Sequence, residues 1–147
     1  MSNFVLVDGS ALVLYLCHRQ SEDLDFFTYD NTSDSQKMRK LIKLFKNKEI
    51  VNISDEQTDI FIDNIKVTFF NAKWSFLKPE NVKNFNVASL KQIAIMKVNT
   101  LFLRAKYRDY YDLYFLANYF KLKDIFDFSK DVLDDINLKL FTTLSTC

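Results

Sequence analysis

Hydrophobic periodicity divides the chain into strands in its first part and helices in its last third. Residues 4–7 form a short apolar run typical of a buried strand, and residues 11–16 suit a buried helix packed on a sheet. The residues that follow predict a second strand carrying Asp23 and Asp25. Strand, tight turn, short helix and strand therefore make one βαβ-like unit at the start of the chain.

An amphipathic helix is expected over residues 33–47, with Ser33 or Asp34 as its cap and apolar side chains at i, i+3, i+4 and i+7. Its other faces are basic and carry no acidic residue. The basic residues are Lys37, Arg39, Lys40, Lys43, Lys46 and Lys48. They are interpreted either as an RNA-facing patch or as an ordinary solvated lysine-rich surface.

Three strands are predicted next, at residues 49–53, 58–62 and 65–70. Asp63-Asn64 tolerates the positive φ angles that a two-residue hairpin turn requires, so Ile62 should pair with Ile65. Counting back from that turn places Asp59 directly opposite Thr68, on the same face of the sheet.

A long loop is expected over residues 71–87, where Trp74 either stacks on a base at the rim of a cleft or packs beneath the loop. Ser89 and Gln92 form a capping-box signature for a helix that ends near residue 104. One or two further amphipathic helices should occupy residues 122–140, followed by a frayed tail.

This order of elements predicts an α+β fold, with a small mixed sheet and helices packed on it. Residues 1–87 should form the core and residues 88–147 a helical part packed on that core, as a single compact unit. A length of 147 residues and a hydrophobic content of 48% fit one domain with a sizeable core.

Charge and cysteine content narrow the functional classes. The formal charge is +1, so any contact with nucleic acid must be local. Cys17 and Cys147 are the only cysteines and imply no disulfide framework. The sequence shows neither a signal-peptide pattern nor a membrane-length apolar segment, which predicts a soluble cytoplasmic protein. The abundance of Phe, Lys, Ile and Asn favours a bacterial source.

Asp23 and Asp25 are the strongest candidates for chemistry. Side chains two apart on a strand share a face, with Cβ atoms roughly 6.5 to 7 Å apart. Two such carboxylates can hold Mg²⁺, or can simply line a solvated strand edge. Gly9-Ser10 opens the first helix, whose N–H groups can receive phosphate. Arg19 suits a phosphate contact or an ion pair with a nearby carboxylate.

These residues carry a family resemblance. Gly9-Ser10 through Asp23-Leu24-Asp25 resembles the first motif of polymerase-beta-like nucleotidyltransferases. The wider string LVDGSALVLYLCHRQSEDLDFF is similar to AbiEii-type nucleotidyltransferases, the toxin halves of type IV toxin–antitoxin pairs. The later segment ASLKQIAIMKVNTLFLRAKYRDYYDLYFL also resembles that family. Its polar positions are occupied by Lys97, Arg104, Asp109 and Asp112.

The resemblance implies a polymerase-beta-like fold and Mg²⁺-dependent transfer of a nucleoside monophosphate from a nucleoside triphosphate to an RNA hydroxyl, such as one on tRNA. It implies a role in abortive infection and a cognate antitoxin, while the lack of a membrane-length apolar segment predicts no membrane partner. The implied catalytic residues are Asp23, Asp25, Lys97 and Asp112. The implied nucleotide-binding residues are Gly9, Ser10, Arg19 and Lys97. Lys97 either contacts phosphate or makes a structural ion pair, and Asp109 or Asp112 holds Lys97 or the acceptor.

Position 68 departs from the family pattern. The resemblance places a third carboxylate where this chain has Thr68, and a neutral hydroxyl cannot replace that charge. We therefore expect slow transfer or none, so a degenerate domain that binds nucleotide, RNA or a partner is the alternative function. Asp59 offers a carboxylate one strand over, although its strand should lie on the side away from Asp23 and Asp25.

Overall fold

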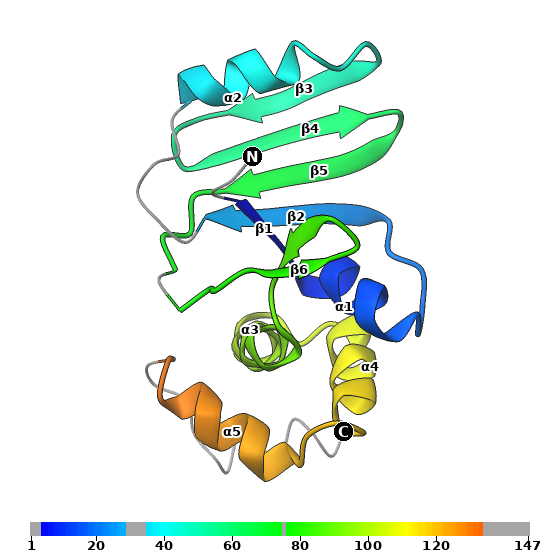
Figure 1. The fold of residues 1–147 in the computed structure, drawn as a ribbon, viewed down its shortest axis with the longest axis vertical. Helices are drawn as coiled ribbons and strands as arrows, with labels where there is room; N and C mark the ends of the chain where they lie inside the picture. The colour runs from blue at the N-terminus through cyan, green and yellow to red at the C-terminus, as the bar shows by residue number, and fades with distance from the viewer. Residues whose placement is uncertain (1–3, 29–34, 75, 134–147) are drawn as a thin grey trace. The chain divides into compact units, whose positions relative to one another are not determined.

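The computed structural model describes residues 4–28, 35–74 and 76–133. Over these residues the chain is a mixed α+β protein with a seven-stranded sheet and five helices (Figure 1). The chain divides into two compact units, Met1–Ser89 and Leu90–Cys147. The first unit contains the whole sheet and two helices, and the second contains three helices.

The first unit begins with strand β1 (Phe4–Val7), helix α1 (Asp8–Leu16) and strand β2 (Asp23–Thr28). Helix α1 ends where Cys17 adopts a left-handed backbone conformation, with φ of 48°. β1 and β2 pair in antiparallel fashion, so the expected βαβ-like unit is wrong in strand direction. A helical connection of this length permits either direction, and the hydrophobic pattern does not distinguish them.

The central strands form the predicted meander of β3 (Lys48–Ile53), β4 (Gln57–Ile62) and β5 (Ile65–Phe70). Asp63 and Asn64 both have positive φ angles, 48° and 66°, as the two-residue turn requires. The predicted register is confirmed, including the pairing of Asp59 with Thr68. β5 then pairs with β2 in parallel, which gives the sheet order β3-β4-β5-β2-β1-β7-β6.

The expectation of a loop over residues 71–87 is wrong in its second half. Strands β6 (Glu80–Val82) and β7 (Phe85–Val87) form a small hairpin, and β7 extends the sheet by pairing with β1 in parallel. Lys83 and Asn84 have φ angles of 49° and 68° at its turn. Strands of three residues are too short to show alternation, and a Lys-Asn turn lacks the usual glycine.

Helix α2 (Ser35–Ile42) covers one face of the sheet (Figure 1). Met38 and Ile42 are buried in a core cluster that it shares with the sheet. The sheet's members of this cluster are Ile60, Val67 and Phe69, with Leu24 and Phe26 packed against them.

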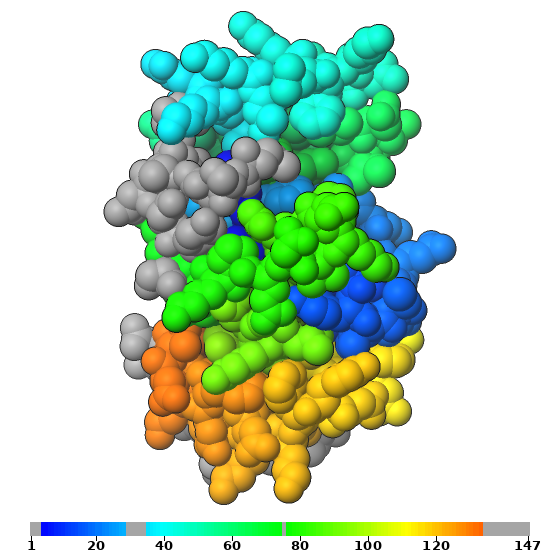
Figure 2. All heavy atoms as spheres, viewed as in Figure 1, coloured from blue at the N-terminus to red at the C-terminus, as the bar shows by residue number. Residues whose placement is uncertain are grey.

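The predicted end of this helix near residue 47 is wrong. The N–H of Leu44 bonds to the carbonyl of Leu41, a tighter turn that breaks the α-helical pattern, and Leu44 is 76% exposed. The candidate caps Ser33 and Asp34 lie outside the described residues. The basic side chains that begin with Lys37 are largely exposed, and Figure 2 shows this segment in cyan at the surface.

The second unit consists of α3 (Leu90–Leu103), α4 (Tyr107–Leu116) and α5 (Leu122–Lys130). Helix α3 begins directly after Ser89, as predicted, and contacts both other helices. α5 occupies the start of the predicted helical region 122–140, and residues 134–147, including the expected tail, lie outside the described part of the chain. Within the described ranges, no helix has the length and apolar character needed to cross a membrane.

Candidate functional site

Asp23 and Asp25 lie on β2 and share one face of the sheet, which confirms the predicted common face. The intervening Leu24, together with Phe26, belongs to the opposite face and packs on the core beneath α2. The two carboxylates therefore lie on the face away from that core, and both are partly exposed. They are accessible to a ligand while their strand is held by paired neighbours on both sides.

A row of polar residues crosses the sheet from Asp25. Asp25 on β2 pairs with Thr68 on β5, and Thr68 pairs with Asp59 on β4, so all three share a face. Neighbouring strands are about 4.8 Å apart, which separates the backbones of Asp25 and Asp59 by about 10 Å. As expected, β4 lies on the far side of β5 from β2.

The carboxylate of Asp59 is fully engaged by its own neighbours. The Thr68 hydroxyl donates to Asp59 Oδ1 at 2.8 Å, and Gln57 Nε2 donates to Oδ2 at 2.7 Å. The residue is only 9% exposed. Asp59 is thus a buried acceptor for the side chain that stands next to Asp25, rather than a third carboxylate beside the pair.

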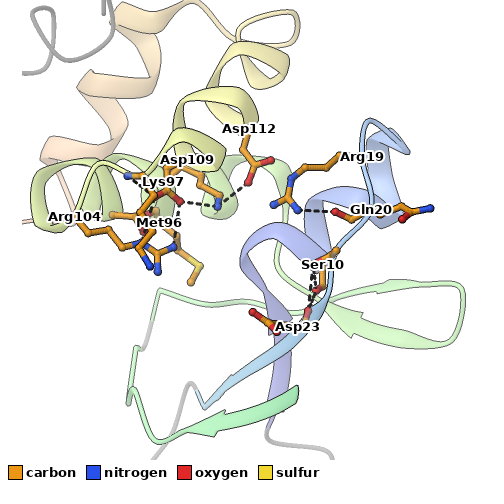
Figure 3. Close-up of polar contacts among 12 residues, drawn as sticks. Ser10, Arg19, Gln20, Asp23, Met96, Lys97, Arg104, Asp109 and Asp112 are labelled. Carbon is orange, nitrogen blue, oxygen red and sulfur yellow. Dashed lines mark hydrogen bonds and ion pairs between the residues drawn. The ribbon is translucent and has the colours of Figure 1, made fainter. Parts of the chain in front are cut away.

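Ser10 connects the start of α1 to the carboxylate strand. Its hydroxyl donates to the backbone carbonyl of Asp23 and lies 2.8 Å from the Ser21 hydroxyl (Figure 3). The residue is buried. Its side chain thus helps to position β2, and a direct contact of Ser10 with nucleotide stays a prediction.

Gly9 makes room for Arg19 at the beginning of α1. A Cβ atom at Gly9 would overlap the Arg19 guanidinium, whose Nη1 also donates to the Gln20 carbonyl at 2.9 Å (Figure 3). A guanidinium beside the positive end of a helix dipole favours an anion nearby. The Arg19 guanidinium thus lies at the start of α1, in whose first turn Asp8 also stands, and a phosphate contact of Gly9 and Arg19 stays a prediction.

Lys97 on α3 is fully buried and paired with two aspartates of α4. Its Nζ lies 2.7 Å from Asp112 Oδ2 and 3.3 Å from Asp109 Oδ1 (Figure 3). Arg104 Nε and Nη2 each donate to Asp109 at 3.2 Å. Two cations and two carboxylates balance one another. The structural ion pair is therefore observed, as is the holding of Lys97 by Asp109 and Asp112, whereas a phosphate contact of Lys97 stays a prediction.

Trp74 belongs to an aromatic cluster. Its ring centroid lies 5.6 Å from that of Phe27 and 5.1 Å from that of Phe76. These contacts match the interpretation that Trp74 packs beneath the loop, and stacking on a base stays a prediction.

Sequence reasoning missed the residues that hold the site in place. Gln57 lies two residues before Asp59, on the same face of β4, and Ser21 lies two residues before Asp23, just ahead of β2. That spacing of two is the signal that could have found them. Tyr15, which donates to Glu80 at 3.0 Å, carried no such signal because the β6–β7 hairpin was not predicted.

The residues present fit a magnesium ion. Within the described residues no group of three or more His, Cys, Asp and Glu side chains is arranged to hold a metal. Asp23 and Asp25 are nevertheless hard oxygen donors on one face, and Thr68 adds a hydroxyl oxygen on the next strand. Mg²⁺ keeps several waters and commonly uses only one or two protein carboxylates, so this donor set suffices.

Solved structures share this fold. A candidate nucleotidyltransferase from H. pylori aligns with a TM-score of 0.66 and 21% identity, covering 98% of this chain and 84% of its own. JHP933 from Helicobacter pylori aligns at 0.63 and 22%, covering 98% and 81%. The Megavirus polyadenylate synthase aligns at 0.56 and 11%, covering 80% and 28%. The fold is that of the polymerase-beta-like nucleotidyltransferases.

Sequence comparison then shows the family. The family described as nucleotidyl transferase AbiEii toxin, type IV TA system, matches residues 64–140, just over half of the chain. An uncharacterized protein of Aquifex aeolicus, aq_aa25, is 35% identical over 127 residues, covering 78% of this chain and 58% of its own length. The chain belongs to the AbiEii nucleotidyltransferase family, and it spans less than two thirds of that relative.

The matched region includes Thr68, Lys97, Asp109 and Asp112. Gly9, Asp23 and Asp25 precede it. Their assignment to the site therefore rests on the strand geometry described above and on the resemblance of the N-terminal motif.

Proposed function

We propose that this chain is a nucleotidyltransferase domain that transfers a nucleoside monophosphate from a nucleoside triphosphate to a hydroxyl group of RNA, such as one on tRNA. The observation that carries the proposal is the pair Asp23 and Asp25, both partly exposed on one face of β2, in a chain of this family and fold. The family description also supports an antitoxin as the partner protein.

Each part of the site has a distinct task. Asp23 and Asp25 would hold a divalent cation, which would supply positive charge to the phosphates and to the departing pyrophosphate. Arg19, beside Gly9, attracts the phosphate chain and orients it. Ser10 fixes the start of β2 through the Asp23 carbonyl, so that the carboxylates do not reorganise when the nucleotide binds.

The basic residues of α2 do not border this site. α2 packs on the face that carries Leu24 and Phe26, whereas Asp23 and Asp25 lie on the other face. The RNA acceptor is an expectation of the family resemblance and draws no support from these lysines, which act as a solvated surface or as a remote contact for a long polyanion.

Binding without turnover is the second candidate function. The observation that favours it is Thr68, which places a neutral hydroxyl beside Asp25 where the family resemblance implies a carboxylate. A domain of this kind binds nucleotide and cation through the same residues but transfers slowly, because the acceptor hydroxyl lacks a strong base nearby.

A transfer assay tests the proposal. The protein is incubated with each labelled nucleoside triphosphate, Mg²⁺ and total tRNA, alongside Asp25→Asn and the matched control Asp63→Asn on the exposed hairpin turn. We expect slow labelling of RNA that is abolished in Asp25→Asn and preserved in Asp63→Asn. Nucleotide binding without labelling would support the second candidate, and labelling by Asp25→Asn at the wild-type rate would contradict the proposed site.

A further inference from the structure

The hydroxyl of Thr68 donates a hydrogen bond in a fixed direction, unlike that of an ordinary surface threonine. A hydroxyl has one proton to donate and two lone pairs that accept. In the 2.8 Å hydrogen bond from Thr68 Oγ1 to Asp59 Oδ1 the hydroxyl is the donor, so its proton stays on the threonine oxygen and points at the carboxylate. The lone pairs of Thr68 are consequently directed elsewhere.

Asp25 occupies the position next to Thr68 on the other side. The two residues are partners in the parallel pairing of β2 with β5, on the face away from the core cluster. A cation held by the side chains of Asp23 and Asp25 would therefore stand over β2, whose backbone runs one strand spacing, about 4.8 Å, from that of β5. Because its proton points at Asp59, the Thr68 oxygen has lone pairs left to face the side of Asp25.

Asp59 is held firmly enough to impose this direction. It is 9% exposed, and its second oxygen accepts a bond of 2.7 Å from Gln57 Nε2. Burying a carboxylate is unfavourable unless hydrogen bonds compensate. Both of its oxygens are compensated by neighbouring side chains on β4 and β5, so its orientation is fixed before any ligand binds.

We propose that Asp59 is a positioning residue that acts through Thr68, turning the threonine oxygen into a neutral ligand or water-anchoring group for the cation shared by Asp23 and Asp25. This inference rests on the proposed function. In this proposal Asp59 on β4 and Thr68 on β5 together form a relay, which takes the place of one carboxylate in direct contact with the cation. The negative charge of Asp59 also polarises the hydroxyl and makes its oxygen a better donor to a cation.

Mn²⁺ affinity, followed by the electron paramagnetic resonance signal of the free ion, tests the relay without relying on activity. Wild type is compared with Asp59→Asn, Thr68→Val, Thr68→Ser and the double variant Asp59→Asn/Thr68→Val. Groups behind a metal ligand typically contribute 10–100-fold in affinity, and we expect about tenfold weakening for Asp59→Asn. Thr68→Val should weaken Mn²⁺ binding by a similar factor. Thr68→Ser, which keeps the hydroxyl, should bind Mn²⁺ like wild type.

The double variant decides whether the two residues act as one. If Asp59 acts through Thr68, the Asp59→Asn change has no further effect once Thr68 is valine. Equal weakening by Asp59→Asn in both backgrounds would overturn the relay in favour of a direct long-range charge effect. Unchanged Mn²⁺ affinity in Asp59→Asn, with lowered thermal stability, would show a purely structural role and also overturn it.

Two controls separate this inference from the proposed function. If Asp23 and Asp25 form the cation site, Asp25→Asn must weaken Mn²⁺ binding. If it does not, the proposed function and the relay fail together. If Asp25→Asn weakens binding while Asp59→Asn does not, only the relay fails. Should Asp59→Asn not fold, the comparison of Thr68→Val with Thr68→Ser carries the test, since equal affinities for valine and serine would contradict the relay.

Discussion

Thr68 stands between two aspartates, one on each neighbouring strand, and this limits what a single substitution there can achieve. In Thr68→Asp the new carboxylate would lie beside Asp59, at the place where the hydroxyl now donates. Two carboxylates in contact cannot both ionise easily, so one of them retains a proton. Restoring an acidic residue at position 68 therefore does not by itself restore a third charge.

A paired substitution should succeed where the single one does not. In Asp59→Asn/Thr68→Asp the amide of residue 59 can donate to the new carboxylate, which stays ionised beside Asp25. We expect this double variant to transfer nucleotide about tenfold faster than Thr68→Asp, a gain below the range typical of a positioned general base. Initial rates with labelled nucleoside triphosphate measure it, with Asp59→Asn as control. A full gain in Thr68→Asp alone would contradict the reasoning.

At the scale of elements, the pairing of α3 with α4 depends on a buried charge cluster. Lys97 lies between Asp109 and Asp112, all three side chains at most 1% exposed, whereas the Arg104 side chain is 41% exposed. Removing one partner from a buried ion pair leaves an uncompensated charge, which is far more destabilising than loss of an exposed partner.

Lys97→Met should therefore lower the free energy of unfolding by about 3–5 kcal/mol. Arg104→Met, the matched control on the same cluster, should lower it by about 1 kcal/mol or less. Urea unfolding of both variants measures the difference. If Lys97→Met leaves the unfolding free energy unchanged but abolishes transfer, Lys97 contacts phosphate and the structural interpretation is wrong.

A second contact between elements, from α1 to β6, gives a pH dependence. The Tyr15 hydroxyl donates to Glu80 Oε2 at 3.0 Å. Burial of the phenol, followed by the hydrogen bond and the negative charge of Glu80, raises the pKa of Tyr15 to about 12 from its ordinary value of 10.0. Because the protonated phenol is favoured in the folded state, its contribution to stability is complete below about pH 10 and is lost as pH rises towards 12.

Tyr15→Phe should remove this contribution. The difference in unfolding free energy between wild type and Tyr15→Phe is expected to be constant up to about pH 10 and to shrink between about pH 10 and 12. Urea unfolding at pH 9 and pH 11.5 measures it, with Tyr119→Phe at an exposed position as control. A difference that stays constant over that range would show that Tyr15 does not titrate differently on folding.

At the scale of the whole molecule, the sheet shows which features follow from sequence. Alternation and the Asp63-Asn64 turn predict the β4–β5 hairpin and its register, because a two-residue turn leaves only one pairing. The β6–β7 hairpin and the antiparallel direction of β1 and β2 do not follow in this way. The direction of β1 relative to β2 depends on contacts distant in sequence, and the strands of the β6–β7 hairpin are too short to show periodicity.

In the candidate site, too, some features follow from the sequence and others depend on tertiary contacts. The common face of Asp23 and Asp25 follows from a spacing of two on a strand, and the pairing of Thr68 with Asp59 follows from the turn. The engagement of Asp59 by Gln57, and the use of the Ser10 hydroxyl on the backbone of Asp23, depend on rotamers that packing selects. Residue spacing thus predicts which strands carry the site, and tertiary contacts decide how each side chain is used.

Direct titration of divalent cation tests the central claim, that Asp23 and Asp25 hold the metal of a nucleotidyltransferase site. Isothermal titration of wild type, Asp25→Asn and the control Asp63→Asn with Mg²⁺ and Mn²⁺ measures the affinities. We predict that wild type and Asp63→Asn bind alike and that Asp25→Asn loses binding. Equal affinities in wild type and Asp25→Asn would place the cation elsewhere and contradict the account.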